Sequence, residues 1–292
     1  MKRVWPVLLL SCFFGIAIGC GSGGGKNDPV LALSSQEALE QGRQLLEEEK
    51  FFKARRFLSH AFEVAPNTAG GREALLLVAD TFYHQGGEAN FIQAEAKYRD
   101  YLNRFPTSDR AAYVQFQLGS CLAQRTRRAD RDQRATAKAL LAFQEVLRLY
   151  PTTEYAAQAR DEIRAVRSQL AEHELGVGKF YINYGLYSAA ITRLAGLLED
   201  YPDYTGRDQA YFFLGKAFEK AGVVTNALEN YGKLSQEYPD SPLVKKIPNL
   251  DDEVIAAAKK AAEVAAAKKA AEEKESKESP ESEDPVDTED GE

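Results

Sequence analysis

Histidine and cysteine are scarce: the 292 residues include three of each, scattered along the chain. No group of them has metal-ligand spacing, and three cysteines cannot build a disulfide framework. The sequence also lacks a nucleophile elbow, a dinucleotide fingerprint and an H-E-x-x-H motif. These absences argue against an enzyme, a metal site or a cofactor. Cys121 falls within a predicted helix, where we expect it to pack as a small buried apolar residue.

Acidic charge is concentrated at the C-terminal end. The formal net charge is −7, and residues 271–292 alone hold eleven acidic residues and two lysines, a net of −9. Residues 275–292 are therefore predicted to be disordered, and the Ala/Lys-rich residues 250–274 to form a helix. The remaining chain is close to neutral, which disfavours nucleic acid as a partner.

The N-terminus reads as an export signal. Lys2 and Arg3 precede an apolar run that is too short to span a bilayer comfortably. Residues 1–19 are predicted to be a signal peptide, and the Ala-Ile-Gly-Cys stretch ending at Cys20 resembles a bacterial lipobox. Lipidation of Cys20 would hold the protein on a membrane; an ordinary signal peptide or short anchor is the alternative. Residues 20–33, rich in glycine, are predicted to be a flexible tether.

The stretch from Asp208 to Pro239 predicts two antiparallel helices joined by a tight turn. Gly215 is expected to face Ala227 where the two helices cross. Seven residues match the offsets of the tetratricopeptide repeat (TPR), a 34-residue helical hairpin: Tyr211, Leu214, Gly215, Phe218, Ala227, Tyr231 and Pro239.

The same pattern recurs upstream, so the sequence predicts an all-α fold, a TPR superhelix over residues 34–242. Ser34 and Glu37 are expected to form a capping box at its start. No stop signal interrupts residues 155–184, which predicts one helix of about 30 residues. About five helix-turn-helix repeats are expected, at residues 35–66, 72–106, 109–151, 155–202 and 206–239.

Residues 130–133 (DRDQ), 150–156 (YPTTEYA) and 173–203 resemble the BamD (YfiO) family of outer-membrane assembly lipoproteins, as does the long helix of the fourth repeat. The resemblance implies a lipid-anchored protein on the periplasmic face of the outer membrane. It also implies partners: the POTRA domains of a BamA-like barrel protein, other lipoproteins of the BAM complex, and unfolded outer-membrane protein precursors.

The resemblance also implies binding residues. Arg193 occupies the position of an arginine that pairs with a POTRA carboxylate in the family. Arg131 and Asp132 are further partner-binding candidates, although the alternating charges of their loop equally fit pairing within the protein. Tyr83, Tyr98 and Tyr101 are candidates for an aromatic precursor groove, with core packing between helices as the alternative.

The sequence thus predicts a non-catalytic scaffold of outer-membrane barrel assembly that recognises partners through helix faces. The alternative is another periplasmic TPR adaptor lipoprotein, acting in Tol-Pal coordination, pilus assembly or the regulation of peptidoglycan synthesis. Those adaptors lack the long fourth-repeat helix and the DRDQ loop.

Overall fold

The computed structural model describes residues 28–125, 129–130 and 132–249, together with residues 256 and 260. Within them the chain forms ten α-helices, two short 3-10 helices and no strand, which confirms the all-α repeat fold. The signal peptide, Cys20, Arg131, and most of the predicted helix 250–274 with the tail 275–292 lie outside the described residues. Contacts divide the chain into two compact units, residues 1–78 and 79–292.

The first unit holds η1 (Pro29–Ala32), the antiparallel pair α1 (Ser35–Glu47) and α2 (Phe51–Val64), and the start of α3 (Ala69–Gln85). The predicted capping box is confirmed, because Ser34 and Glu37 bond reciprocally at the start of α1. The predicted tether is too long, since Val30 in η1 is buried and η1 contacts α2. An apolar residue after the proline lets this end of the tether fold back on the helices.

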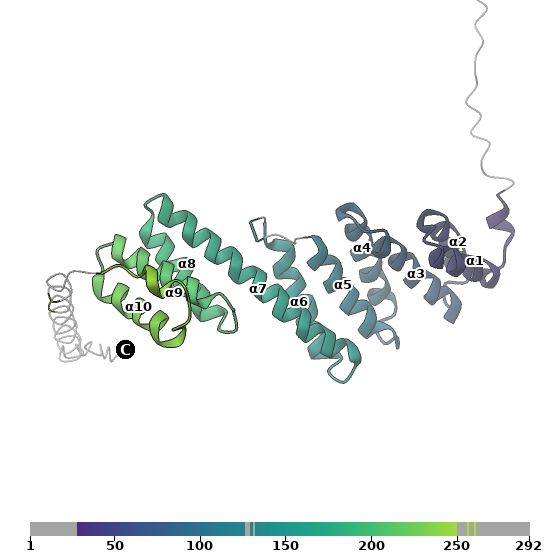
Figure 1. Cartoon of the computed structure of the whole chain (residues 1–292). Helices are drawn as coiled ribbons and strands as arrows, with labels where there is room; N and C mark the ends of the chain where they lie inside the picture. Colours follow the sequence, from purple (N-terminus) through teal and green to yellow (C-terminus); the bar gives the residue numbers. More distant parts are fainter. Residues whose placement is uncertain (1–27, 126–128, 131, 250–255, 257–259, 261–292) are drawn as a thin grey trace, which may run out of the picture. The chain divides into compact units, whose positions relative to one another are not determined.

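The second unit continues from α3, and from α4 onward each helix packs against the next along the chain (Figure 1). Such nearest-neighbour packing is the pattern of a helical repeat protein. The helices after α3 are α4 (Glu88–Arg104), α5 (Ala111–Arg125), α6 (Arg134–Leu149), α7 (Glu154–Asn183), α8 (Tyr187–Asp200), α9 (Arg207–Lys220) and α10 (Val224–Glu237), followed by η2 (Val244–Lys246).

Glycines in the first helix of four repeats allow close packing against the second. A Cβ atom on any of them would lie 2.5–2.7 Å from a large side chain of the paired helix, too close for contact without a shift. A Cβ atom on Gly215 would meet the ring of Tyr231 first, and the expected approach of Gly215 to Ala227 stays a prediction. The four pairs are Gly42–Leu58, Gly119–Phe143, Gly178–Leu194 and Gly215–Tyr231.

The predicted long helix is confirmed: α7 has 30 residues and passes along two repeats. It packs against α5 and α6 on one side of the array and against α8 and α9 on the other. Near its start, the ring of Tyr155 lies 5.6 Å from that of Tyr113 and 5.9 Å from that of Phe116, both in α5. Figure 1 shows α7 running obliquely past its shorter neighbours.

Candidate docking surface on the hairpin of α7 and α8

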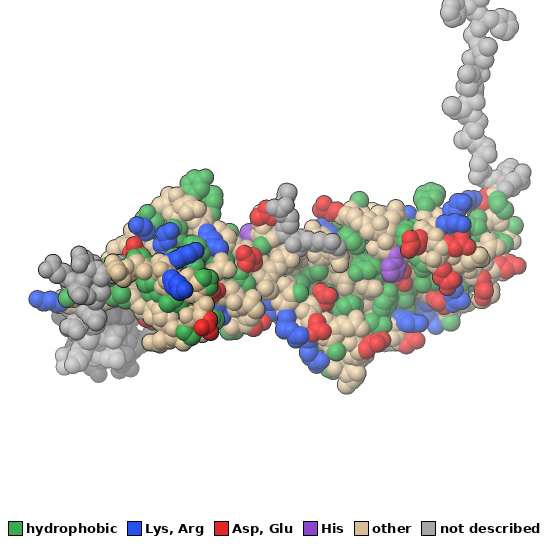
Figure 2. Space-filling model, viewed as in Figure 1, with side chains coloured by type: hydrophobic (Ala, Val, Ile, Leu, Met, Phe, Trp, Pro, Cys, Tyr) green, Lys and Arg blue, Asp and Glu red, His purple; other side chains and the backbone are tan. Residues whose placement is uncertain are grey.

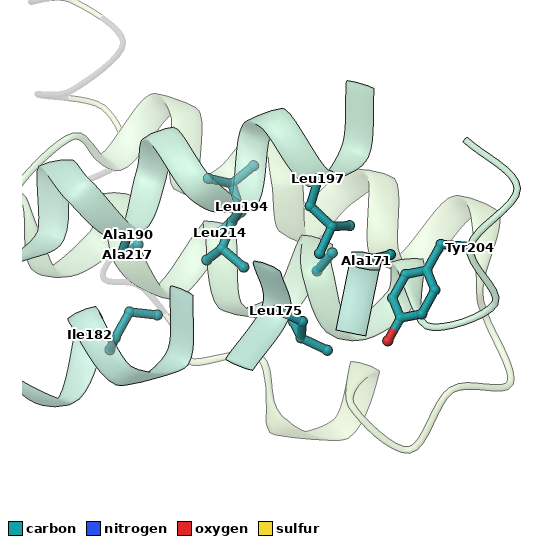
Figure 3. Close-up of a cluster of buried hydrophobic side chains, with 10 residues drawn as sticks. Ala171, Leu175, Ile182, Ala190, Leu194, Leu197, Tyr204, Leu214 and Ala217 are labelled. Carbon is teal, nitrogen blue, oxygen red and sulfur yellow. The ribbon is translucent and has the colours of Figure 1, made fainter. Parts of the chain in front are cut away.

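A cluster of buried apolar side chains positions the hairpin of α7 and α8 (Figure 3). Leu175 and Ile182 lie on one face of α7, two helical turns apart, and Leu194 and Leu197 of α8 close over them. Leu214 of α9 completes the cluster. Because α8 is packed on both sides, its outward residues are held on a rigid support.

Arg193 lies on the exposed surface of this hairpin, with half of its side chain accessible. Its Nη1 donates to Oε2 of Glu174 in α7 at 3.2 Å. An exposed ion pair of this kind contributes only about 0–1 kcal/mol. The guanidinium has further N–H donors, so Arg193 can bind a carboxylate of another protein while Glu174 holds its orientation.

The free end of the same hairpin exposes apolar side chains. Phe180 is 51% exposed, Tyr184 69% and Leu186 52%, and the rings of Phe180 and Tyr184 lie 4.4 Å apart. Gly185 takes a positive φ of 74° in the turn that reverses the chain between α7 and α8. Figure 2 shows hydrophobic side chains gathered at this end of the molecule, where α7 meets α8 in Figure 1.

A cleft of about 560 Å³ adjoins this apolar end. It lies between α7 and the loop that leads into α6, and Nδ1 of His173 contacts the carbonyl oxygen of Ala129 at 2.5 Å across it. The lining combines aromatic and apolar residues with two carboxylates: Ala129, Asp130, Glu172, His173, Gly176, Val177, Phe180 and Tyr181.

Described charged residues on either side of the loop before α6 pair within the protein. Asp132 accepts hydrogen bonds from the backbone nitrogen and Nε of Arg134, at 2.9 and 2.7 Å, and these bonds lower the pKa of Asp132 below its usual value. Arg125, which precedes the loop, pairs with Glu95 at 2.8 Å. The structure therefore places Asp132 at the start of α6 with a partner of its own, and Arg193 on α8 with Glu174.

The three tyrosines that were candidates for a precursor groove differ in how far they are buried. Tyr98 and Tyr101 are 0% and 2% exposed, so they pack in the core, as the alternative interpretation holds. Only Tyr83 keeps accessible surface, with its ring edge-on to His84 and tilted against Phe91. The periodicity of α4 could have shown this, because Ala94, Tyr98 and Tyr101 form one apolar stripe.

A buried carboxyl beside Tyr98 was not anticipated from the sequence. Asp80 is 7% exposed and accepts hydrogen bonds at Oδ1 from the hydroxyls of Tyr98 (2.6 Å) and Tyr113 (2.9 Å). Burial is the main cause that raises the pKa of Asp80, and the tyrosine donors oppose it. This network links α3, α4 and α5 and leaves little of itself accessible to a ligand.

Comparison of the sequence with models of protein families shows which family the chain belongs to. The family model described as YfiO, outer membrane lipoprotein, matches residues 32–234, which include Arg193, the exposed apolar end and the cleft. The chain belongs to this family.

Relatives of this YfiO-family chain include proteins named outer membrane protein assembly factor BamD. The relative from Haemophilus influenzae is 26% identical over 271 residues, covering 89% of this chain and all of that protein. The one from Caulobacter vibrioides is 29% identical over 60% of this chain and 56% of its own length. The one from Xylella fastidiosa is 33% identical over 39% of each chain.

Metal ligands and membrane-spanning helices are both absent from the described residues of this YfiO-family protein. No group of three or more histidine, cysteine or acidic side chains in that part of the chain could hold a metal ion. None of the helices described there is both long and apolar enough to cross a membrane.

Proposed function

We propose that this protein is a non-catalytic scaffold of outer-membrane protein assembly. It docks on the POTRA domains of a BamA-like barrel protein and assists the folding and insertion of barrel precursors. The observation that carries the proposal is the family match over residues 32–234, together with an H. influenzae assembly factor aligned along its whole length. Other lipoproteins of the BAM complex are further partners in this proposal.

Docking uses helix faces that are already ordered. Arg193 offers a guanidinium whose orientation Glu174 maintains, and a carboxylate on the partner would replace or share that contact. Arginine is well suited to such a site, because its planar fork binds a carboxylate through two hydrogen bonds. A rigid hairpin avoids the entropy cost of ordering a loop on binding.

Membrane attachment in this proposal comes from lipid on Cys20. Acyl chains contribute about 0.8 kcal/mol per buried CH₂ group, and more than one chain gives a stable anchor. The protein would then face the periplasm from the outer membrane. Labelling cells with radioactive palmitate tests this step: the full-length protein should incorporate label, and a Cys20→Ser variant should not. Label that persists in the variant contradicts the assignment.

Charge reversal at Arg193 tests the docking role. The Arg193→Glu variant should bind purified POTRA domains at least tenfold more weakly, because it sets two carboxylates against the partner's carboxylate. Arg148→Glu is the matched control, since Arg148 is an exposed helix arginine paired with a glutamate in α6. Helicity should be unchanged in both. Equal binding by Arg193→Glu and wild type would remove Arg193 from the interface.

A different periplasmic adaptor role is the competing outcome. Purification from detergent-solubilised envelopes should recover a BamA-like barrel protein with the wild type. Recovery of Tol-Pal, pilus or peptidoglycan-synthesis components in its place would contradict the proposed function.

A further inference from the structure

Three lysines lie along one face of α9 and the part of α7 that packs beside it. Residues advance by about 100° each around a helix, so those three or four apart share a face. On α9 one such face carries, in order, Gln209, Phe213, Lys216 and Lys220. Lys179 of α7 reaches it, because its Nζ lies 4.8 Å from the centre of the Phe213 ring and donates to Oε1 of Gln209 at 3.0 Å. We call Lys179, Lys216 and Lys220 the lysine stripe.

Within the described residues the lysine stripe is barely neutralised. No ion pair there involves Lys179 or Lys216, and Lys220 approaches only Glu219, at 3.9 Å. Glu219 itself accepts a hydrogen bond from the hydroxyl of Tyr231 at 2.9 Å. Like charges one turn apart on a helix, as at Lys216 and Lys220, repel each other. An anionic segment bound here would therefore be stabilised by the field of the stripe.

The chain that follows α10 returns to the first turn of α9. Oγ of Ser241 donates to Oδ2 of Asp208 at 2.7 Å, and Oδ1 of Asp208 accepts from the backbone nitrogen of Gln209 at 2.8 Å. At 1.5 Å per residue, Lys216 and Lys220 lie about 12 and 18 Å further along α9. Figure 2 shows Lys and Arg side chains gathered at this end of the molecule, around α9 of Figure 1.

The same chain contains a segment of opposite charge within reach. Residues 278–292, called the acidic segment below, hold eight acidic residues and no lysine or arginine. The continuous description of the chain ends at residue 249. With residues 250–274 as the predicted helix, about 37 Å long, the remaining 18 residues still span up to about 65 Å when extended. That length is enough to return to α9.

We propose that the acidic segment binds the lysine stripe of its own molecule. Ammonium groups pair with carboxylates as point charges, so the contact needs no single conformation of the segment. Each exposed pair is weak, but attachment to the same chain gives the segment an effective concentration in the millimolar range. While bound, the segment keeps other anionic ligands off this face of α7 and α9, and high salt releases it. The inference does not depend on the proposed function.

Other acidic occupants are disfavoured by the same attachment. A segment from a second copy, or from another acidic protein, has to compete at its free concentration with a segment held at millimolar effective concentration. The tethered segment of the same molecule therefore has the advantage whenever the protein is dilute.

Zero-length crosslinking of the full-length protein in detergent tests the contact directly. A carbodiimide joins an amine to a carboxylate only where the two touch. At low salt, mass spectrometry should find bonds from the acidic segment to Lys216 or Lys220 and not to Lys138, an exposed lysine of α6. The bonds should disappear in 1 M NaCl, where the screening length is about 3 Å. Absence of these bonds at low salt, or equal coupling to Lys138, would overturn the proposal.

A free peptide of residues 278–292 measures whether the stripe is already occupied. The tail-neutral variant is full-length protein in which the eight acidic residues of the segment are changed to glutamine or asparagine. The peptide should bind this variant at least fivefold more tightly than wild type, because the segment of the wild type competes. Equal affinity would mean that the segment does not occupy the stripe.

The lysines are tested in the tail-neutral background. Lys216→Gln with Lys220→Gln should weaken peptide binding at least fivefold, and Lys138→Gln should leave it unchanged. Glutamine keeps most of the aliphatic stem, so circular dichroism should be the same for all three proteins. Unchanged peptide binding by the double variant would remove the stripe from the contact.

A mixture of isotope-labelled and unlabelled wild-type protein identifies which molecule supplies the segment. Crosslinks should join residues of the same isotope composition. Crosslinks mainly between labelled and unlabelled molecules would show a second copy as the occupant and overturn the proposal.

Discussion

Gly178 of α7 and Leu194 of α8 approach so closely that no side chain fits between them: a Cβ atom on Gly178 would lie 2.6 Å from Cδ2 and Cγ of Leu194. Leu194 is fully buried and cannot move aside freely. We expect Gly178→Val to destabilise the protein by about 1–3 kcal/mol or more through overpacking. Denaturant unfolding, followed by circular dichroism, measures the change.

Gly176 provides the matched control for that substitution. It lies two residues earlier in the same helix and is exposed, and a Cβ atom added to it would meet nothing within 4 Å. Gly176→Ala should stabilise the helix by up to about 1 kcal/mol, because alanine restricts the unfolded chain. Gly178→Ala should not stabilise the protein in this way, because its Cβ atom would clash with Leu194. Similar effects at the two positions would show that the close approach is absent in solution.

The buried carboxyl of Asp80 predicts a pH dependence of stability. Burial raises its pKa, and donors and charges from Tyr98, Tyr113, His84 and Arg110 only partly oppose this. A carboxyl whose pKa is raised on folding adds stability that is full below its unfolded value of 3.8 and is lost as pH rises through the folded value. Acidification from pH 7 should therefore favour the wild type relative to an Asp80→Asn variant.

The measurement is the difference in free energy of unfolding between Asp80→Asn and wild type at pH 7 and at pH 5. Asparagine keeps an Oδ1 acceptor for both tyrosine hydroxyls, so the variant should be at least as stable at pH 7. The difference should shrink toward pH 5. A difference that is constant or grows on acidification would contradict a raised pKa.

Cys121 is predicted to be chemically inert in the folded protein. It is fully buried, and burial is the main cause that raises its pKa to about 12. In a full-length variant with Cys12→Ser and Cys20→Ser, Cys121 is the remaining thiol. Its reaction with Ellman's reagent at pH 8 should be at least about a hundredfold slower in buffer than in guanidinium chloride. Equal rates would place the thiol at the surface.

Removal of the N-cap of α1 should cause a local loss of stability. Oγ of Ser34 accepts from the backbone of Glu37 at 3.3 Å, and Oε2 of Glu37 accepts from the backbone of Ser34 at 2.9 Å. Ser34→Ala should cost about 1 kcal/mol, seen as faster amide exchange in α1. Ser168→Ala, at an exposed position inside α7, should cause no loss. Unchanged exchange in Ser34→Ala would mean that the cap contributes little.

Local patterns in the sequence were sufficient for the helices. Apolar spacing and a missing stop signal predicted α7, which begins and ends within one residue of the expected limits. The capping box depends on residues three apart, and the burial of Cys121 on the general tendency of cysteine to be buried, so both were predictable. The close contact of Gly215 with the ring of Tyr231 was not anticipated, because it depends on how far one helix slides along the other.

What the sequence by itself determined is the set of helices and which of their faces are apolar, because each depends on spacing within one segment. Only the tertiary structure decided which apolar faces are covered. It buried Tyr98 and Tyr101 between helices and left Phe180 and Tyr184 open. Coverage depends on where a neighbouring helix begins: α6 starts beside Gln169, so it does not extend along the last turns of α7, which pack against α8 on their other side. The spacing of apolar residues within α7 does not show where α6 begins.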